Sequence, residues 1–299
     1  MTTALARTRP RGFAPWAPRP ASKALVDDVL AVLAAYADYL PLTVRQIFYR
    51  LVATVSFDKT ETAYARLCEA IGRARRAGLI PFAAIRDDGA ARYEAASWES
   101  LESFLDGVRR DARAFRLDRQ DGQPVRLWTL CEAAGMAPML ARTAQPFSVP
   151  VLTSGGFDSL TAKHGLATEL SSAMRSGVQA EILHLGDLDP SGEHLFSSLA
   201  EDVSAMCRAL CGEEPVFTRL AVTRAQADEM NLPTAPPKKT DRRRFTGDTV
   251  QAEAIPPDVL TGILHDAITA RRDPAQADAV LNRERDIRDA LLARLEGSP

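Results

Sequence analysis

The sequence predicts an α/β protein in which a helical N-terminal part precedes a parallel sheet and a helical extension follows it. Three observations support this fold class. Apolar residues recur at helical spacing up to residue 117, short apolar runs alternate with helical segments from 125 to 222, and helical spacing returns after residue 257. Strands that alternate with helices through short connections form parallel sheets with right-handed crossovers.

Composition excludes several classes of protein. The 299 residues are 46% hydrophobic and 25% charged, which rules out a mainly disordered or fibrous chain. The 37 Lys and Arg against 39 Asp and Glu leave no global basic field of the kind that marks many nucleic-acid-binding proteins. The four cysteines form no CxxC pair, so no zinc site is expected. Residues 1–22 carry arginines and prolines where a secretory peptide needs an apolar core, so we expect a flexible basic tail and a cytoplasmic protein without membrane contact.

In the N-terminal part we expect helices over residues 23–40, 44–53, 61–77 and 97–117. Ser22 and Thr43 are suited to cap the first two helices, and Gly78 to end the third. The apolar stretch 79–85 and the turn-like residues 87–89 follow the third helix. Helix, short helix, helix and an extended wing is the pattern of a winged helix-turn-helix domain, whose recognition helix enters the DNA major groove.

The third and fourth helices each carry a feature with a functional interpretation. The third ends in Arg73, Arg75 and Arg76, which are the predicted DNA-binding residues because arginines there could contact phosphates. The fourth has an apolar face that we expect to be buried; it consists of Leu101, Phe104, Leu105, Val108 and Phe115.

Beyond residue 124 we expect four strands, over residues 125–130, 149–153, 180–185 and 216–222, in a small Rossmann-like parallel sheet. Helices are expected over residues 133–141, 159–176 and 192–210. A last strand near 250–255 and two helices, about 258–268 and 275–295, follow. The predicted parts are the tail (1–22), the winged-helix domain (23–118), the sheet domain (124–232) and the C-terminal extension (238–299).

Three acidic residues follow the ends of two predicted strands. Glu132 comes just after the first strand, and Asp187 and Asp189 just after the third. In an open α/β sheet the ligand crevice lies outside the carboxyl ends of the strands. Carboxylates that converge there repel one another unless a hard cation neutralises them, and Mg²⁺, with Mn²⁺ as an alternative, suits phosphodiester chemistry.

The order strand, Glu, helix, strand, helix, strand, Asp-x-Asp-x-x-Gly resembles the Toprim domain of topoisomerases, primases and OLD-family nucleases. The resemblance covers about residues 125–222. It implies that Glu132 is the Toprim glutamate, with a catalytic and a metal-binding role, and that Asp187 and Asp189 are the metal-binding Asp pair. Glu193, just after the motif glycine, could be an outer-sphere acid, and Glu253 on the last predicted strand could add a carboxylate.

The second predicted helix contains Arg45-Gln46-Ile47-Phe48-Tyr49. This segment resembles the Arg-x-x-Tyr-Tyr segment of the topoisomerase VI A subunits and the related meiotic double-strand-break proteins, in which a winged helix also precedes a Toprim domain. The resemblance implies that Tyr49 attacks a DNA phosphate, leaving a protein-linked 5′ end and a free 3′ hydroxyl. A phenol has a pKa near 10, so a nearby cation such as Arg45, or a base, is needed to favour the phenolate. The alternative is that Tyr49 packs in the core.

The function expected from these features is Mg²⁺-dependent cleavage of duplex DNA by a topoisomerase VI A-like enzyme. Two alternatives remain open: a hydrolytic Toprim endonuclease, OLD-like or of a plasmid- or phage-defence system, that uses a metal-bound water instead of Tyr49, and a non-catalytic DNA-binding regulator. A homodimer is expected because double-strand cleavage needs two active sites. The sequence contains no GxxxxGK[ST] loop, so ATP-driven strand passage would need a separate ATPase partner subunit.

Overall fold

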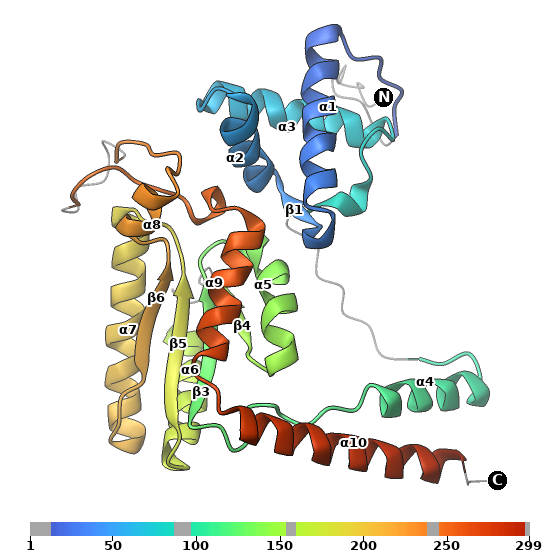
Figure 1. Cartoon of the computed structure of the whole chain (residues 1–299), viewed down its shortest axis with the longest axis vertical. Helices are drawn as coiled ribbons and strands as arrows, with labels where there is room; N and C mark the ends of the chain where they lie inside the picture. Colours follow the sequence, from blue (N-terminus) through green and yellow to red (C-terminus); the bar gives the residue numbers. More distant parts are fainter. Residues whose placement is uncertain (1–12, 87–96, 154–159, 238–244, 297–299) are drawn as a thin grey trace, which may run out of the picture.

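The computed structural model describes residues 13–86, 97–153, 160–237 and 245–296 and is drawn in Figure 1. The N-terminal elements are α1 (Pro20–Ala35), η1 (Ala37–Tyr39), β1 (Leu42–Thr43), α2 (Val44–Val55), α3 (Glu61–Arg76), η2 (Phe82–Ala84) and β2 (Ile85–Arg86). After them come α4 (Leu101–Arg113) and the sheet, and the chain ends with α9 and α10. The expected α/β class is confirmed.

Local capping explains where the N-terminal helices begin. Thr43 caps α2 as predicted: its hydroxyl accepts a hydrogen bond from Gln46 N–H, and the Gln46 side chain accepts one from Thr43 N–H. Gly78 follows α3 with a φ of +75°, the left-handed conformation in which glycine commonly ends a helix. The prediction for Ser22 is wrong, because α1 already begins at Pro20, whose fixed φ suits the first turn of a helix.

The wing expected after α3 is not seen within the described residues. β1 and β2 pair in parallel over two residues each, with Leu42 opposite Ile85. The turn predicted at residues 87–89 lies outside the described residues, as does the rest of the segment 87–96. The helices of the expected winged-helix domain are therefore present, and the winged-helix assignment itself stays a prediction.

The central sheet has four parallel strands in the order β4-β3-β5-β6. Its elements are β3 (Val125–Cys131), η3 (Ala134–Met136), α5 (Ala137–Ala144), η4 (Gln145–Phe147), β4 (Val151–Thr153), α6 (Leu160–Arg175), β5 (Gln179–Leu185), α7 (Pro190–Cys211), β6 (Val216–Ala221) and α8 (Arg224–Glu229). After β3, the next strand along the chain, β4, lies on one side of β3, and the following strand, β5, lies on the other side of β3. The strand order thus reverses between β3 and β5, which is where ligands bind in open α/β sheets.

Helices cover both faces of this sheet (Figure 1). Trp128 and Leu130 of β3 pack with α6 and α7 in one apolar cluster. Their neighbours Leu127 and Cys131 belong to a second cluster with α5 and α9 (Pro257–Thr269), as the alternation of side chains along a strand requires. The second cluster continues into α1, α2 and α3, so the N-terminal helices and the sheet share one core.

The C-terminal extension differs from the prediction in one element. Residues 250–255 form no strand: Val250 makes an isolated antiparallel bridge to Leu188, and η6 (Ala252–Ala254) follows. Residues 251–253 instead form hydrogen bonds with α2, Thr43 and the loop after β5. Pro256 and Pro257 then start α9. The chain ends in α10 (Pro274–Glu296).

The prediction that the apolar face of α4 is buried is wrong for most of its residues. Leu101, Phe104 and Leu105 are exposed, and only Gly107 and Ala112 of this helix are fully buried. The reason is that α4 lies beside α10 and away from the rest of the molecule (Figure 1). We refer to residues 97–113 together with α10 as the α4–α10 arm.

Candidate active site

The three predicted acids lie at the carboxyl ends of β3 and β5, at the topological switch point. Glu132 follows β3 and is still held to the neighbouring strand, because its N–H donates to the carbonyl of Leu185 (2.9 Å). Asp187 and Asp189 lie in the loop between β5 and α7, and Asp189 is the N-cap of α7. The structure therefore brings together the residues that the sequence places on two separate strands.

The carboxylate of Glu132 lies against two glycines of the Asp loop. Its Oε2 accepts a hydrogen bond from Asp187 N–H (2.8 Å). A Cβ atom on Gly186 would lie 2.6 Å from the same oxygen, and one on Gly192 would lie 2.9 Å from it. Both distances are too short for a real contact, so these positions need glycine for Glu132 to lie here.

The two aspartates each have one oxygen in a hydrogen bond to the backbone. Asp187 Oδ1 accepts from Ala252 N–H (2.8 Å), and Asp189 Oδ1 accepts from Gly192 N–H at the first turn of α7 (2.7 Å). No hydrogen bond within the described residues reaches Oδ2 of either aspartate. Each aspartate is thus fixed in orientation and keeps one oxygen available.

Burial and mutual repulsion disfavour the charged forms of these acids. Burial, followed by the charge of Asp187, raises the pKa of Glu132 to about 7, and Asp189 acts in the same direction. Burial also raises the pKa of Asp187. Groups that must be charged to do chemistry but repel one another in a low-dielectric site need a nearby positive charge.

Arg219 on β6 supplies part of that charge, and sequence reasoning missed it. Its guanidinium donates to the backbone carbonyl of Asp187 and, through Nε, to that of Val222 (3.0 Å). Burial lowers the pKa of Arg219, while Glu193, Glu132 and the two aspartates act against this. A single arginine inside an apolar strand was the available signal, because a buried cation usually faces a partner.

The donor set fits a hard divalent cation. Carboxylate oxygens are the ligands that Mg²⁺ prefers, and Asp187 and Asp189 each keep one oxygen that accepts no hydrogen bond from the described residues. Among the described residues, no three His, Cys, Asp or Glu side chains lie close enough to one another to form a metal-binding group. Glu132, Asp187 and Asp189 would therefore have to draw closer together to share one ion.

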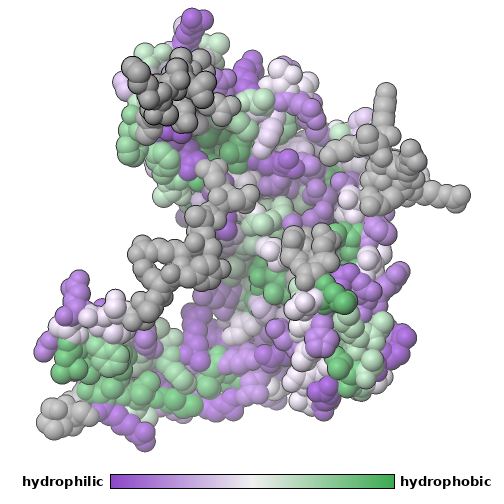
Figure 2. All heavy atoms as spheres, turned by 180° about the vertical axis from the view of Figure 1, so that it is seen from behind, coloured by the Kyte–Doolittle hydropathy of each residue, from purple (hydrophilic) through white to green (hydrophobic). Residues whose placement is uncertain are grey.

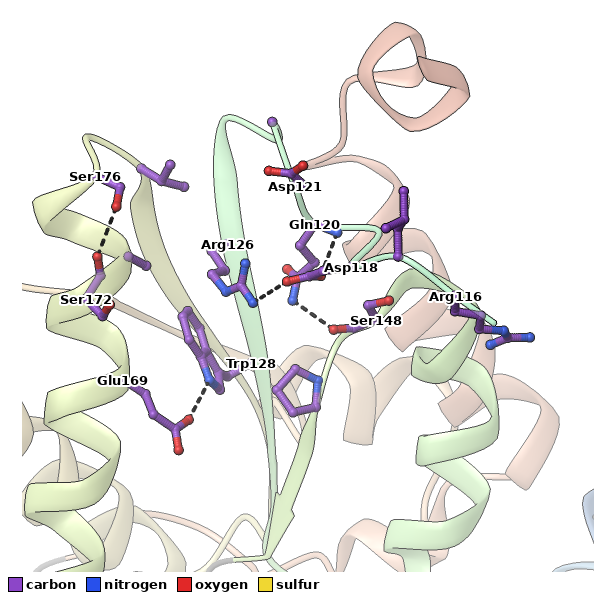
Figure 3. Close-up of a pocket in the computed structure, with 15 residues that line it drawn as sticks. Arg116, Asp118, Gln120, Asp121, Arg126, Trp128, Ser148, Glu169, Ser172 and Ser176 are labelled. Carbon is purple, nitrogen blue, oxygen red and sulfur yellow. Dashed lines mark hydrogen bonds and ion pairs between the residues drawn. The ribbon is translucent and has the colours of Figure 1, made fainter. Parts of the chain in front are cut away.

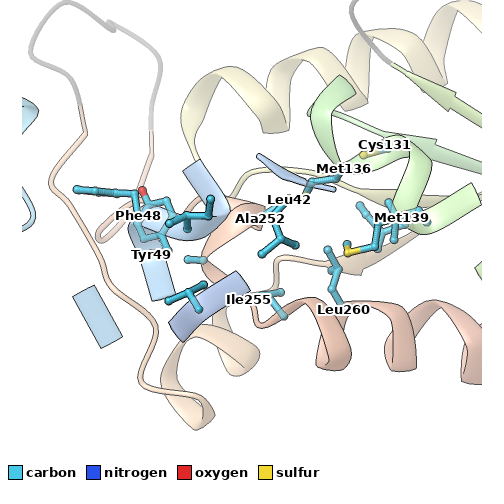
Figure 4. Close-up of a cluster of buried hydrophobic side chains, with 14 of the residues drawn as sticks. Leu42, Phe48, Tyr49, Cys131, Met136, Met139, Ala252, Ile255 and Leu260 are labelled. Carbon is cyan, nitrogen blue, oxygen red and sulfur yellow. The ribbon is translucent and has the colours of Figure 1, made fainter. Parts of the chain in front are cut away.

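Tyr49 lies on α2 in a buried position among apolar side chains (Figure 4). Its hydroxyl donates to Gln251 Oε1 (2.8 Å). Burial raises the pKa of Tyr49 to about 12; Arg45 opposes this effect, and Asp187 and Glu253 add to it. Tyr49 is thus a neutral phenol in this structure, held by an amide that cannot take its proton.

Arg45 and Glu253 form a pair next to Tyr49. Arg45 Nε lies 3.6 Å from Glu253 Oε2, and Thr43 Oγ1 donates to Glu253 Oε1 (2.6 Å). Burial raises the pKa of Glu253, against the effects of Thr43 and Arg45. The guanidinium of Arg45 also lies 5.8 Å from the ring centre of Tyr64. Arg45 is therefore engaged with Glu253 and Tyr64.

Residues 251–253 connect α2 to the Asp loop through three consecutive contacts. Gln251 accepts the hydroxyl of Tyr49, Ala252 donates to Asp187, and Glu253 binds Thr43 and Arg45. We call residues 251–253 the bridge. The sequence offered no signal for Gln251, because a lone glutamine has no characteristic spacing to its partners.

The predicted DNA-binding arginines lie at the end of α3. Arg73 and Arg76 are exposed, and Arg73 pairs with Glu69 one turn earlier (2.7 Å). Arg75 donates to the carbonyls of Phe82 (3.3 Å) and Ile85 (3.4 Å). Arg75 thus holds the segment after α3 in place, while Arg73 and Arg76 lie on the surface.

Three further residues near the acids are a buried histidine and two exposed side chains. His184 is buried in β5 and stacks on Phe196 with ring centres 4.1 Å apart, as a core residue should. Glu193 and His194 are exposed on the first turn of α7.

A pocket of about 890 Å³ lies elsewhere, beside the amino-terminal end of β3 (Figure 3). Its lining includes Arg126, Trp128 and Glu169, and Trp128 Nε1 donates to Glu169 (3.4 Å). None of the three site acids lines it. In the described part of the chain no helix is long and apolar enough to cross a membrane.

The chain was compared with known proteins at three levels. No protein-family model, curated protein or solved structure matches it.

Proposed function

We propose that this chain binds duplex DNA and cleaves its phosphodiester bonds at the site formed by Glu132, Asp187 and Asp189. The observation that carries the proposal is the convergence of these acids at the switch point of a parallel sheet, directly beside α2 of the N-terminal helices. The resemblance to the Toprim domain and to the topoisomerase VI A subunits agrees with this arrangement.

The three acids would hold Mg²⁺ or Mn²⁺. Such a cation, when bound, neutralises charge that develops on the phosphate and its oxygens during cleavage. The protein's own contribution is to fix the acids: the hydrogen bonds from Asp187 N–H, Ala252 N–H and Gly192 N–H orient one oxygen of each carboxylate. Arg219 lies beside them and reduces their mutual repulsion.

Two nucleophiles could act at this site, the Tyr49 hydroxyl and water. In transesterification, the oxygen of Tyr49 would form a bond to phosphorus, its proton would be lost to solvent, and the 3′ oxygen of DNA would leave and take up a proton. For this step Tyr49 must first leave Gln251, because the present contact leaves the phenol buried and protonated.

In hydrolysis, water would form the bond to phosphorus and lose a proton, one bridging oxygen of the phosphodiester would leave and take up a proton, and Tyr49 would remain a packing residue. The burial of Tyr49 and the raised pKa of about 12 favour this second candidate in the conformation seen here. If DNA binding released the bridge, transesterification by Tyr49 would be favoured instead.

The deciding experiment is cleavage of supercoiled plasmid with Mg²⁺, analysed with and without protease digestion before electrophoresis. Release of cut DNA only after digestion, and its loss in Tyr49→Phe, would establish the tyrosine route. Protein-free cut DNA that persists in Tyr49→Phe but disappears in Asp187→Asn would establish hydrolysis.

Two controls make the experiment specific to the site. Asp266→Asn removes an exposed carboxylate from α9 and should leave cleavage unchanged. Equal activity of the wild type, Asp187→Asn and Glu132→Gln would refute the proposal. DNA binding without any cutting would instead point to the non-catalytic regulator.

A further inference from the structure

The α4–α10 arm exposes an apolar surface that nothing in the rest of the described chain covers. Leu101, Phe104 and Leu105 lie at the spacing of one face of α4, Trp98 packs on Phe104 from the segment before the helix, and each of the four is at least 39% exposed. Leu281 and Ile287 add two more exposed apolar side chains on α10. Figure 2 shows hydrophobic side chains gathered on this arm.

The apolar face is preorganised. The ring of Trp98 lies across Gly107, where a Cβ atom would come within 2.7 Å of it. Phe104 meets the same ring edge to face, with centres 5.4 Å apart. A half-exposed tryptophan fixed in this way is the kind of residue that anchors protein interfaces.

The base of the arm is held by hydrogen bonds between α10 and the segment that leads from α4 to β3. Glu284, buried in α10, accepts hydrogen bonds from Leu117 N–H (3.0 Å) and Arg119 (3.1 Å), and Arg288 donates to the carbonyl of Phe115 (3.2 Å). The arm is thus fixed where it leaves the sheet domain, with its apolar face already formed.

We propose that this face pairs with the same face of a second copy of the chain, so that the two arms form a four-helix interface. The charges on the arm favour this occupant. Among the described side chains of the arm, acidic and basic residues are nearly balanced: Glu99, Glu102, Asp106, Asp111, Asp278, Glu284, Asp286 and Asp289 against Arg109, Arg110, Arg113, Arg283, Arg285, Arg288 and Arg294. Two identical arms therefore do not repel each other, whereas a polyanion or a lipid surface would require a surplus of one sign.

The area also fits a pair of identical arms. Half-exposed aromatic side chains leave on the order of 100 Å² each open to solvent, and the six residues together reach the roughly 300–600 Å² that marks interaction sites. Two such faces pressed together approach the smaller specific interfaces, which bury about 1,200 Å² in total. This inference does not depend on the chemistry of the acid site.

The test is the molar mass of the full chain in solution, measured by sedimentation equilibrium between about 1 and 50 μM. The wild type should be a dimer, and Leu101→Glu and Phe104→Glu should each weaken the dimer at least tenfold. Leu160→Glu is the matched control: Leu160 is 69% exposed on α6, against 66% for Leu101, and its substitution should leave the dimer intact.

A wild-type monomer at 50 μM, or a dimer that resists both arm substitutions, would overturn the proposal. Circular dichroism distinguishes loss of pairing from loss of folding: because Leu101 is exposed in the monomer, Leu101→Glu should keep the far-UV spectrum of the wild type. The measurement needs neither DNA nor cation, so its failure is separate from failure of the proposed function. If both hold, the monomeric variants should nick plasmid and no longer linearise it.

Discussion

Gly186 and Gly192 shape the acid site by having no side chain. A Cβ atom on Gly192 would lie 2.7 Å from the carbonyl of Asp187 and 2.9 Å from the carboxylate of Glu132. We expect Gly192→Ala to reduce cleavage at least tenfold and to destabilise the fold by about 1–3 kcal/mol, the usual cost of overpacking. Plasmid cleavage and urea unfolding measure the two effects.

Gly165 provides the control for that substitution. It lies within α6, and a Cβ atom added there would have no neighbouring atom within 4 Å. Gly165→Ala should therefore stabilise the protein by about 0.5–1 kcal/mol, the usual gain for this change inside a helix, and leave cleavage unchanged. Equal behaviour of the two variants would show that Gly192 has no special role at the site.

His184 should make the protein sensitive to acid. Burial, assisted by the charge of Arg219, lowers the pKa of His184 to about 3. Between about pH 6.5 and 3 the unfolded chain therefore binds a proton that the folded chain does not, so stability falls as the pH falls, by up to about 1.4 kcal/mol per pH unit. Urea unfolding at pH 7, 5.5 and 4.5 should show a shallower fall for His184→Leu.

The exposed His194 separates this effect from the mere loss of a histidine. His194→Leu should retain the acid sensitivity of the wild type, because His194 is exposed on α7. A wild-type slope in His184→Leu would contradict the assignment of the acid sensitivity to His184.

At the level of elements, the bridge connects the start of α2 to the acid site. Thr43 both caps α2 and donates to the buried Glu253, whereas Thr223 caps α8 through the same kind of capping box without a carboxylate partner among the described residues. Thr223→Ala should cost about 1 kcal/mol. Thr43→Ala should cost about 2–3 kcal/mol, because it also removes a hydrogen bond from a buried acid.

A double-mutant cycle tests that difference. The combination of Thr43→Ala with Glu253→Gln should be less destabilising than the sum of the two single changes, with the free energy of unfolding measured by urea titration. Strict additivity would mean that the hydrogen bond between Thr43 and Glu253 does not contribute to stability.

For the whole molecule, cation binding should appear as added stability. A ligand present at one hundred times its dissociation constant stabilises the folded state by about 2.7 kcal/mol. Mg²⁺ or Mn²⁺ should therefore raise the melting temperature of the wild type, and Asp187→Asn should abolish the shift. Asp266→Asn should preserve it; a shift of equal size in all three proteins would place the cation elsewhere.

The accuracy of sequence-based prediction differs between parts of the molecule for physical reasons. The Thr43 cap, the four strands and the placement of Glu132, Asp187 and Asp189 follow from local patterns and from the rule that strand ends share one edge of a sheet. The exposure of the α4 face, the partners of Arg219 and the role of Gln251 depend on which distant segments meet. No local pattern contains that information.

The bridge has a consequence for the timing of any chemistry at this site. Its three contacts come from consecutive residues, so a shift of the backbone at Ala252 would release Tyr49, Asp187 and Arg45 together. The site would then change in a single step between a form in which the bridge contacts are made and a form in which all three are broken. Under the proposed function, a loosely associated DNA segment would meet only the form in which these contacts are made, and it would not be cut.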